Sequence, residues 1–464
     1  MTDLSKPLSL NDEPALNNAF NDAFIKGLSE LIRHYRPPKN IAVTGYWGTG
    51  KTSALKQLYF EVSGELPPGM HGEEKEPDQK KNEESHFLPV WFEAWLYQHE
   101  EQPIVALLHE IRAKMGIYAK LFRETEKIAN VSLLGALKIF DDVIALASGK
   151  TVKPETGKIM DIGEKFEQKH YLSSLPREAI NKYLQQAISD VLKSGEDGTN
   201  DVLKSGEDGT KTLVIFIDDL DRCLPEAALR LLEGIKIYLN LNNCIVVFGM
   251  DHRQLEQSLQ KALPGAETGQ TSYYAREYLE KICQDIHYLP VPSQKEKSDY
   301  FLELLQTIDC GDHDKKNVHC KILEKLLNKH DCLPANPRKI KILVNRTALV
   351  LRAYPLPGTQ QDNLRWHTLL LVVVIIYVFH KPVYEQLDKN PAYISEVCSC
   401  SENFFGTKND ERMRPMQEFV PSEDKSRNAL PVNPSDSNVW RLHRLLASLN
   451  PVTRKELEPF LRLS

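Results

Sequence analysis

The chain has 464 residues, with 58 basic and 64 acidic side chains and a formal net charge of −6. At roughly 150 residues for each domain, this length predicts two or three domains. Hydrophobic residues make up 41% of the chain and charged residues 26%, which excludes a wholly disordered protein. The mildly acidic balance argues against a protein that coats nucleic acid through its overall charge, although a local basic groove stays open.

The cysteines and the N-terminal residues indicate a reducing compartment. Eight cysteines are sparse for this length and form no framework of the kind that small secreted domains use. Residues 1–14 contain no basic-then-apolar signal region. The longest apolar run, residues 368–379, is shorter than the ~20 residues that a membrane-spanning helix needs. We therefore expect a cytoplasmic protein without a transmembrane segment, in which this run is a buried helix or strand.

The first region of the chain, residues 1–40, is predicted to form a helix. Asn11 or Asp12, with Pro14 in the first turn, is typical of a helix start. Apolar residues then recur at spacings of three and four, and a pair of prolines ends the helix. The predicted apolar face comprises Leu16, Phe20, Phe24, Leu28, Leu31 and Tyr35.

The second region, residues 41–291, alternates apolar runs with helical patterns. Strands that alternate with helices indicate a doubly wound parallel sheet of the α/β class. The expected strands lie at 41–44, 88–95, 212–219, 244–251 and 286–291, and the expected helices at 53–62, across much of 103–192, and at 225–239.

An insertion of helical and linker sequence, at about 96–211, lies between the second and third expected strands. It contains the segment DVLKSGEDGT at 190–199 and again at 201–210. Two copies are too few for a solenoid, so the polar repeat is interpreted as a duplicated surface linker. Residues 292–464 are predicted to form a helical C-terminal region with a polar loop at about 399–438.

The run GYWGTGKT, from Gly45 to Thr52, fits the phosphate-loop pattern G-x-x-x-x-G-K-[ST]. The glycines let the backbone turn its N–H groups toward phosphate oxygens, and the following helix offers the positive end of its dipole. We expect Lys51 to reach the β- and γ-phosphates and the Thr52 hydroxyl to hold Mg²⁺. The predicted nucleotide-binding residues are Gly45, Trp47, Gly48, Thr49, Gly50, Lys51, Thr52 and Ser53.

A phosphate loop needs a partner carboxylate for magnesium. Asp218, at the end of the third expected strand, is the candidate, because ligands of open α/β sheets bind at the carboxyl ends of strands. Asp219 follows directly and is the candidate catalytic acid, since a carboxylate there can orient or deprotonate the attacking water. The alternative is that Asp219 and Asp221 only cap the helix that begins near Pro225.

The motifs WGTGKTS, VWFEAW, IFIDDLDRC and VVFGMD, in this order, resemble the KAP family of P-loop NTPases. The stretch YLEKI at 278–282 and the element NPR at 336–338 also match, so the resemblance covers about residues 10–350. It implies a three-layer sheet of the additional-strand type with a mostly helical C-terminal region. It also implies Mg²⁺-dependent hydrolysis of ATP that drives a conformational switch, and many bacterial relatives act in defence against phages or plasmids.

Four further residues are candidates for a nucleotide sensor or for an arginine that neutralises developing charge. Asp251 ends the fourth expected strand and can either sense the γ-phosphate or cap the next helix. Arg222, Arg276 and Arg338 are candidate arginine fingers, each with the alternative of an ordinary surface or interdomain arginine.

The sequence leaves more than one function open. The first hypothesis is an Mg²⁺-dependent ATPase switch, and the alternative is a nucleotide-dependent scaffold that hydrolyses little ATP and assembles a partner effector. The chain shows no separate effector domain, which favours a protein partner or self-association in either case. A small-molecule kinase is disfavoured by the long insertion and helical tail, and a nucleic-acid motor has no support in the net charge. The preference for ATP over GTP comes from the resemblance alone.

Overall fold

The computed structural model describes residues 7, 9–11, 20–70, 87–125, 141, 144, 184–185, 188, 212–263, 271–308, 313–353, 360–379, 381–395, 398, 443–449 and 451–461. The chain divides into two compact units. The sheet unit comprises residues 15–45 and 51–289, and the helical unit comprises residues 1–14, 46–50 and 290–464. Residues 46–50, inside the predicted phosphate loop, therefore group with the helical unit, although the chain joins them to the sheet unit at both ends.

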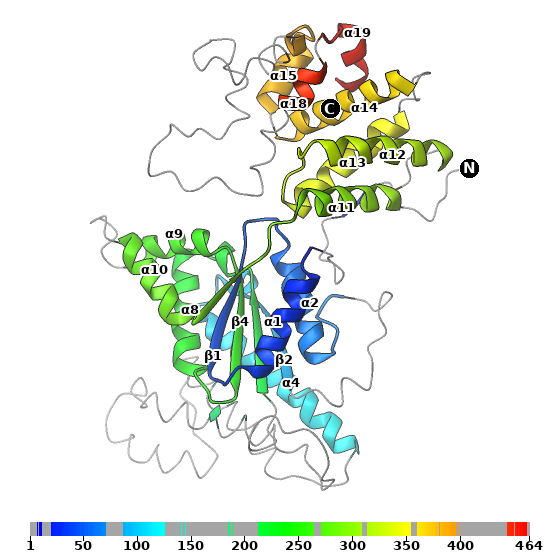
Figure 1. The fold of residues 1–464 in the computed structure, drawn as a ribbon. Helices are drawn as coiled ribbons and strands as arrows, with labels where there is room; N and C mark the ends of the chain where they lie inside the picture. Colours follow the sequence, from blue (N-terminus) through cyan, green and yellow to red (C-terminus); the bar gives the residue numbers. More distant parts are fainter. Residues whose placement is uncertain are drawn as a thin grey trace, which may run out of the picture. The chain divides into compact units, whose positions relative to one another are not determined.

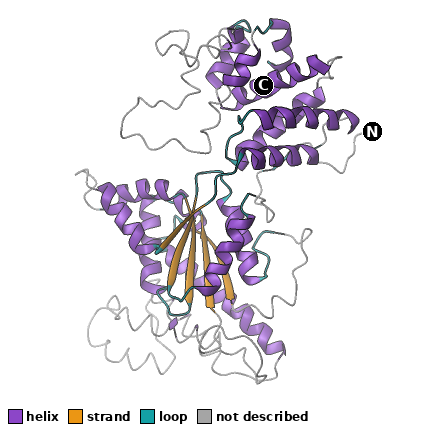
Figure 2. Ribbon diagram, viewed as in Figure 1, coloured by secondary structure: helices purple, strands orange, loops and turns teal. Residues whose placement is uncertain are grey.

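Five parallel strands form the sheet, in the order β2–β3–β4–β1–β5 (Figure 2). Their bounds are β1 Lys39–Thr44, β2 Phe87–Glu93, β3 Thr212–Asp218, β4 Cys244–Met250 and β5 Asp285–Tyr288. Strand β4 lies between β1, which leads into the phosphate loop, and β3, which ends at Asp218. This is the additional-strand arrangement, so the predicted α/β fold is confirmed.

Helices cover both faces of the sheet, which gives three layers (Figure 1). Strand β3 shows why its sequence is almost continuously apolar: Leu213 and Ile215 enter one core, whereas Val214 and Phe216 enter the other. Helices α1 Asp22–His34 and α2 Lys51–Ser63 pack on one face. Helices α4 Pro103–Thr125, α8 Pro225–Tyr238, α9 His252–Ala262 and α10 Thr271–Ile282 pack on the other.

The first helix buries most of its predicted apolar face, with Leu31 as the exception. Residues 20 and 21 form a turn before α1 begins at Asp22, and the predicted helix start near Pro14 lies outside the described residues. Its buried apolar residues are Ile25, Leu28 and Ile32, whereas Leu31, which the prediction placed in the core, is 48% exposed. Leu28 is buried as predicted, and Phe24 and Tyr35 are partly buried against the same core, so packing keeps most of the predicted stripe and shifts it from Leu31 toward Ile25 and Ile32.

The helical unit is built around α14, which contains the longest apolar run of the chain. Residues 369–376 are all buried in its core, so the expectation of a buried helix or strand there is confirmed as a helix. Within the described residues, the α-helices of this unit are α11 Gln294–Thr307, α12 His313–Lys329, α13 Pro337–Ala353, α14 Gln360–Phe379, α15 Lys381–Lys389, α18 His443–Leu449 and α19 Arg454–Leu457.

Within the described residues, no single helix is long and apolar enough to cross a membrane. One pair, Asn363–Phe379 with Val383–Lys389, reaches the required length only together and with a bend of 120°. Three predicted features lie outside the described residues: the helix start at 12–19, the duplicated segment at 190–210 and the polar loop at 399–438. Most of the predicted insertion beyond α4 lies outside them too.

Candidate functional site

Acidic side chains gather where β3 ends. Asp218 is the last residue of β3 and pairs in register with Glu93, the last residue of β2. Asp219 follows in the left-handed conformation, with φ of 58°, a region that Asp and Asn adopt more readily than most residues. The chain then turns into the short helix η3, Leu220–Arg222, which contains Asp221. The edge of the sheet unit therefore carries several carboxyl groups within a few residues.

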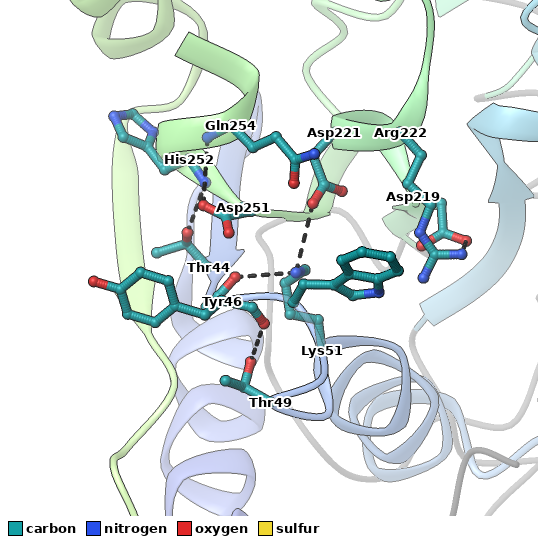
Figure 3. A network of polar contacts seen from close by, with 12 residues as sticks. Thr44, Tyr46, Thr49, Lys51, Asp219, Asp221, Arg222, Asp251, His252 and Gln254 are labelled. Atoms are coloured by element: carbon teal, nitrogen blue, oxygen red, sulfur yellow. Dashed lines mark hydrogen bonds and ion pairs between the residues drawn. The ribbon is translucent and has the colours of Figure 1, made fainter. Parts of the chain in front are cut away.

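Lys51 begins α2 and holds a nearly buried ammonium group beside these acids. Its Nζ donates a hydrogen bond to the carbonyl oxygen of Gly45 at 3.0 Å and lies 3.5 Å from Oδ2 of Asp221 (Figure 3). The two side chains are only 9% and 5% exposed, and charges that are buried need a partner of opposite sign. Asp221 is therefore the ion-pair partner of Lys51.

This ion pair changes the interpretation of Asp221. The sequence offered the alternative that Asp219 and Asp221 cap the helix near Pro225. In the structure Leu224 is the N-cap of α8, and no side chain makes a capping hydrogen bond there. That alternative is wrong, because the short helix η3 separates both acids from α8 and turns Asp221 toward Lys51.

The two predicted magnesium ligands meet in the sheet unit. The Thr52 hydroxyl, in the first turn of α2, is hydrogen-bonded to the carboxyl group of Asp218. Gly249 of β4 makes room for this contact: a Cβ atom there would lie 2.8 Å from Oδ1 of Asp218 and would collide with Leu55 of α2. Ser53 follows Thr52 and is half-buried. The sequence did not single out Gly249, because its importance depends on two elements that are distant in the chain.

Burial and the crowding of like charges change the acidity of these groups. The pKa of Asp218 is raised to about 7, mainly by burial, with the charges of Asp219 and Asp221 adding to the effect. Burial also raises the pKa of Asp219, although the Arg222 guanidinium opposes it. The edge therefore carries more carboxyl groups than its cations neutralise, and a divalent cation would offset that excess.

Two buried oxygens at this edge suit a cation. Among the described residues, Oδ1 of Asp218 and Oδ1 of Asp221 are buried and have no hydrogen-bond partner. Nowhere in the described residues are three or more His, Cys, Asp or Glu side chains arranged so that they could hold a metal ion by themselves. The combination fits Mg²⁺, which binds through one or two carboxylates together with phosphate oxygens and water.

Replacing Asp218 by Asn should stabilise the protein in the absence of nucleotide. The folded-state pKa of about 7 lies above the ordinary value of 3.8, so ionisation opposes folding and the free energy of unfolding falls as pH rises between these values. Asn cannot ionise. At pH 8 the free energy of unfolding of the variant should therefore exceed that of the wild type by on the order of 4 kcal/mol, and near pH 4 the difference should vanish. Urea unfolding at both pH values measures this, and equal stability at pH 8 would contradict the raised pKa.

Arg222 and Glu93 are among the charged groups that act on Asp219. Nη1 of Arg222 lies 3.0 Å from Oδ2 of Asp219, so the candidate arginine pairs with the candidate catalytic acid (Figure 3). Glu93 raises the pKa of Asp219 through its charge, and its Oε1 accepts a hydrogen bond from Nε1 of Trp91 at 3.2 Å. Glu93 lies within the VWFEAW motif, which by itself assigns the residue no role. Its place near the carboxyl end of the strand predicted at 88–95 was the signal that could have found it.

Asp251 caps α9. Its Oδ1 accepts hydrogen bonds from the backbone N–H groups of Arg253 and Gln254, at 3.2 and 3.4 Å. The capping alternative is thus confirmed. Burial raises the pKa of Asp251, and the positive charge of Lys51 partly opposes this rise. A role as nucleotide sensor stays a prediction.

The other two candidate arginines lie in different surroundings. Arg276 is an exposed residue of α10, and its charge lowers the pKa of His252, at the start of α9. Arg338 is in the first turn of α13, and its guanidinium carbon lies 5.7 Å from the centroid of the Trp47 ring. The structure therefore brings Arg222 to the acids and Arg338 to the phosphate loop, whereas the charge of Arg276 acts on His252, at the start of α9.

The loop residues 46–50 have the backbone that their glycines predict. Gly48 and Gly50 have φ values of 82° and 92°, which residues with a side chain rarely adopt. The hydroxyl and the N–H of Thr49 both donate hydrogen bonds to the carbonyl oxygen of Tyr46, at 2.6 and 3.2 Å. The loop is thus closed on itself by a tight turn.

Comparison with known proteins identifies the sequence pattern. The model of the KAP family P-loop domain matches residues 21–354. An uncharacterized protein of Methanocaldococcus jannaschii is 26% identical over 176 residues, which cover 35% of this chain and 89% of that protein. The structure of the Aeropyrum pernix ORC2 protein, in ADPNP–ADP complexes, is 10% identical and aligns over 95% of this chain and 96% of that chain, with a TM-score of 0.33. A score this low bears on neither the fold nor the function of this chain.

Proposed function

The chain belongs to the KAP family of P-loop domains, and from that premise we propose that it binds ATP with Mg²⁺ and hydrolyses it to drive a conformational switch. The observation that carries the proposal is the meeting of Lys51 and Thr52, from the start of α2, with Asp218 and Asp221 at the end of β3. A lysine, a hydroxyl and carboxylates in this arrangement are the groups that phosphates and Mg²⁺ require.

Different residues of the sheet unit would bind the metal ion and the phosphates. Thr52 and Asp218 would hold Mg²⁺, which when bound neutralises charge on the phosphates. Lys51 would bind the β- and γ-phosphates. Its ammonium group has three N–H donors, so it can keep its hydrogen bond to the Gly45 carbonyl and turn another donor toward phosphate. Asp221 then shares its partner with the nucleotide.

Asp219 is the residue that we assign to the attacking water. Burial raises its pKa, and a carboxylate whose pKa lies closer to the working pH is a better proton acceptor. The ion pair with Arg222 acts in the opposite direction, because the guanidinium lowers that pKa. This pair is the observation that favours the second candidate function, a scaffold that binds ATP and scarcely hydrolyses it while Arg222 stays on Asp219.

Phosphate release from ATP by the purified protein tests the two functions against each other. A switch should release phosphate in the presence of Mg²⁺ and only at background level with EDTA. GTP measured in parallel decides the base preference. Tight binding of ATP without release would support the scaffold, and a failure to bind ATP under any of these conditions would contradict both.

A further inference from the structure

Asn336 connects the phosphate loop to the start of α13. It stands immediately before the first residue of that helix and is only 2% exposed. Its Oδ1 accepts a hydrogen bond from the backbone N–H of Lys339 at 3.2 Å, and its Nδ2 donates to the carbonyl oxygen of Trp47 at 2.8 Å. One amide group therefore caps a helix with its oxygen and holds a loop carbonyl with its nitrogen.

Close packing strengthens the same junction. A Cβ atom at Gly48 would lie 2.6 Å from Oδ1 and 2.8 Å from Nδ2 of Asn336, so the amide rests against bare loop backbone. The backbone N–H of Arg338 approaches the Gly48 carbonyl oxygen at 3.4 Å, and the Arg338 guanidinium faces the Trp47 ring. All of these residues belong to the helical unit.

The bond from Asn336 has a consequence for the phosphate cradle. The C=O and N–H groups of a trans peptide point in opposite directions. A Trp47 carbonyl that is held by Asn336 therefore turns the N–H of Gly48 away from α13 and leaves it available to an anion. In a phosphate loop, inward N–H groups of this kind bind the phosphate oxygens.

We infer that Asn336 is a positioning residue, which fixes the Trp47–Gly48 peptide for phosphate binding and transmits nucleotide occupancy to α13. The inference rests on the proposed function and deepens it, because it names the contact through which the loop residues 46–50 and α13, both of the helical unit, respond to nucleotide. The coupling is reciprocal: if the Asn336 contact strengthens nucleotide binding, nucleotide must strengthen that contact by the same factor. The N–H groups of Arg338 and Lys339 are then the reporters of occupancy.

Asn336→Ser is the sharpest test. Serine is also a favoured N-cap, so it keeps an acceptor for the Lys339 N–H, but it lacks the amide nitrogen that reaches the Trp47 carbonyl. We expect MgATP to bind about fivefold to tenfold more weakly, the effect of one lost hydrogen bond. The melting temperature without nucleotide should fall only slightly, because the cap of α13 is kept and one hydrogen bond is lost. Asn336→Asp keeps the cap as well and should weaken binding at least as much, since a carboxylate then faces the carbonyl.

Asn345→Ala is the matched control. Asn345 lies on the same helix, and its amide exchanges two hydrogen bonds with the backbone of Leu10, at 2.7 and 3.0 Å, so neither bond involves the loop. The Asn345→Ala variant should bind MgATP with the affinity of the wild type. In the wild type, MgATP should also slow hydrogen exchange at residues 337–345, and Asn336→Ser should lose this response.

The possible results distinguish a failure of the role inferred for Asn336 from a failure of the proposed ATP-binding function. Wild-type affinity in both Asn336 variants, an equal loss in Asn345→Ala, or exchange at 337–345 that ignores MgATP in the wild type would each overturn the inference and leave the proposed function standing. If the wild-type protein binds no MgATP at all, the proposed function fails and the inference fails with it.

Discussion

Lys51→Ala should weaken the binding of ATP at least about a hundredfold, because the variant loses charge-assisted hydrogen bonds to two phosphates. Each such bond contributes about 1.5–3 kcal/mol, so two of them exceed the 2.7 kcal/mol that a hundredfold change represents. Equilibrium titration with a fluorescent ATP analogue measures the loss. Unchanged affinity would remove Lys51 from the phosphate site.

The same variant also leaves a carboxylate without its partner, and this effect must be separated from the loss of binding. Asp221 is 5% exposed and pairs with Lys51, and breaking a buried pair destabilises a protein by about 3–5 kcal/mol. The double variant Lys51→Ala/Asp221→Asn removes the unpaired charge and should recover much of the stability. Its affinity for ATP should still be at least about a hundredfold below that of the wild type. Recovery of binding in the double variant would mean that misfolding, and not the missing ammonium group, explained the single variant.

Lys56→Ala provides the matched control for this experiment. Lys56 is a second buried lysine of α2, and its Nζ donates to the carbonyl oxygen of Pro68 and faces the Trp91 ring. Its removal also deletes a buried ammonium group from the same helix, but that group makes none of the contacts with Gly45 and Asp221. ATP affinity should therefore stay at the wild-type level.

The position of Asp218 at the end of a strand could be predicted from the sequence. The contacts that surround it could not. A continuous apolar run identifies a buried parallel strand, and the acid that ends it must lie at the edge where ligands bind. Nothing local indicates that Asp221 pairs with Lys51 or that Gly249 leaves space for the Asp218 carboxyl group. Those contacts depend on the order of the strands, which brings β4 between β1 and β3.

Contacts within the helical unit could not be predicted from the sequence either. The NPR element at 336–338 could be noticed as a motif, but the hydrogen bond from Asn336 to Trp47 joins residues that are far apart in the chain. In α1, the helical period fitted two adjacent stripes, and only tertiary packing decided between Leu31 and Ile32. Local patterns therefore predict elements and their ends, whereas the partner of each side chain depends on contacts between distant segments.

The left-handed backbone of Asp219 points to a functional role for this acid. An ordinary residue is destabilised by about 1–2 kcal/mol in this region, and such conformations persist where surrounding contacts hold them. Here the ion pair with Arg222 is one such contact. Because asparagine adopts the same region as readily as aspartate, Asp219→Asn should keep the backbone and change only the charge.

That variant should bind ATP like the wild type and turn it over about a hundredfold more slowly, the scale of lost general-base assistance. Single-turnover phosphate release under saturating MgATP measures the chemical step apart from binding. Glu226→Gln, which neutralises an exposed acid in the first turn of α8, is the control for the change in charge and should hydrolyse at the wild-type rate. Full activity in Asp219→Asn would move the role of base to another carboxylate. Glu93 would then be the next residue to replace, because it ends the neighbouring strand and its charge already acts on Asp219.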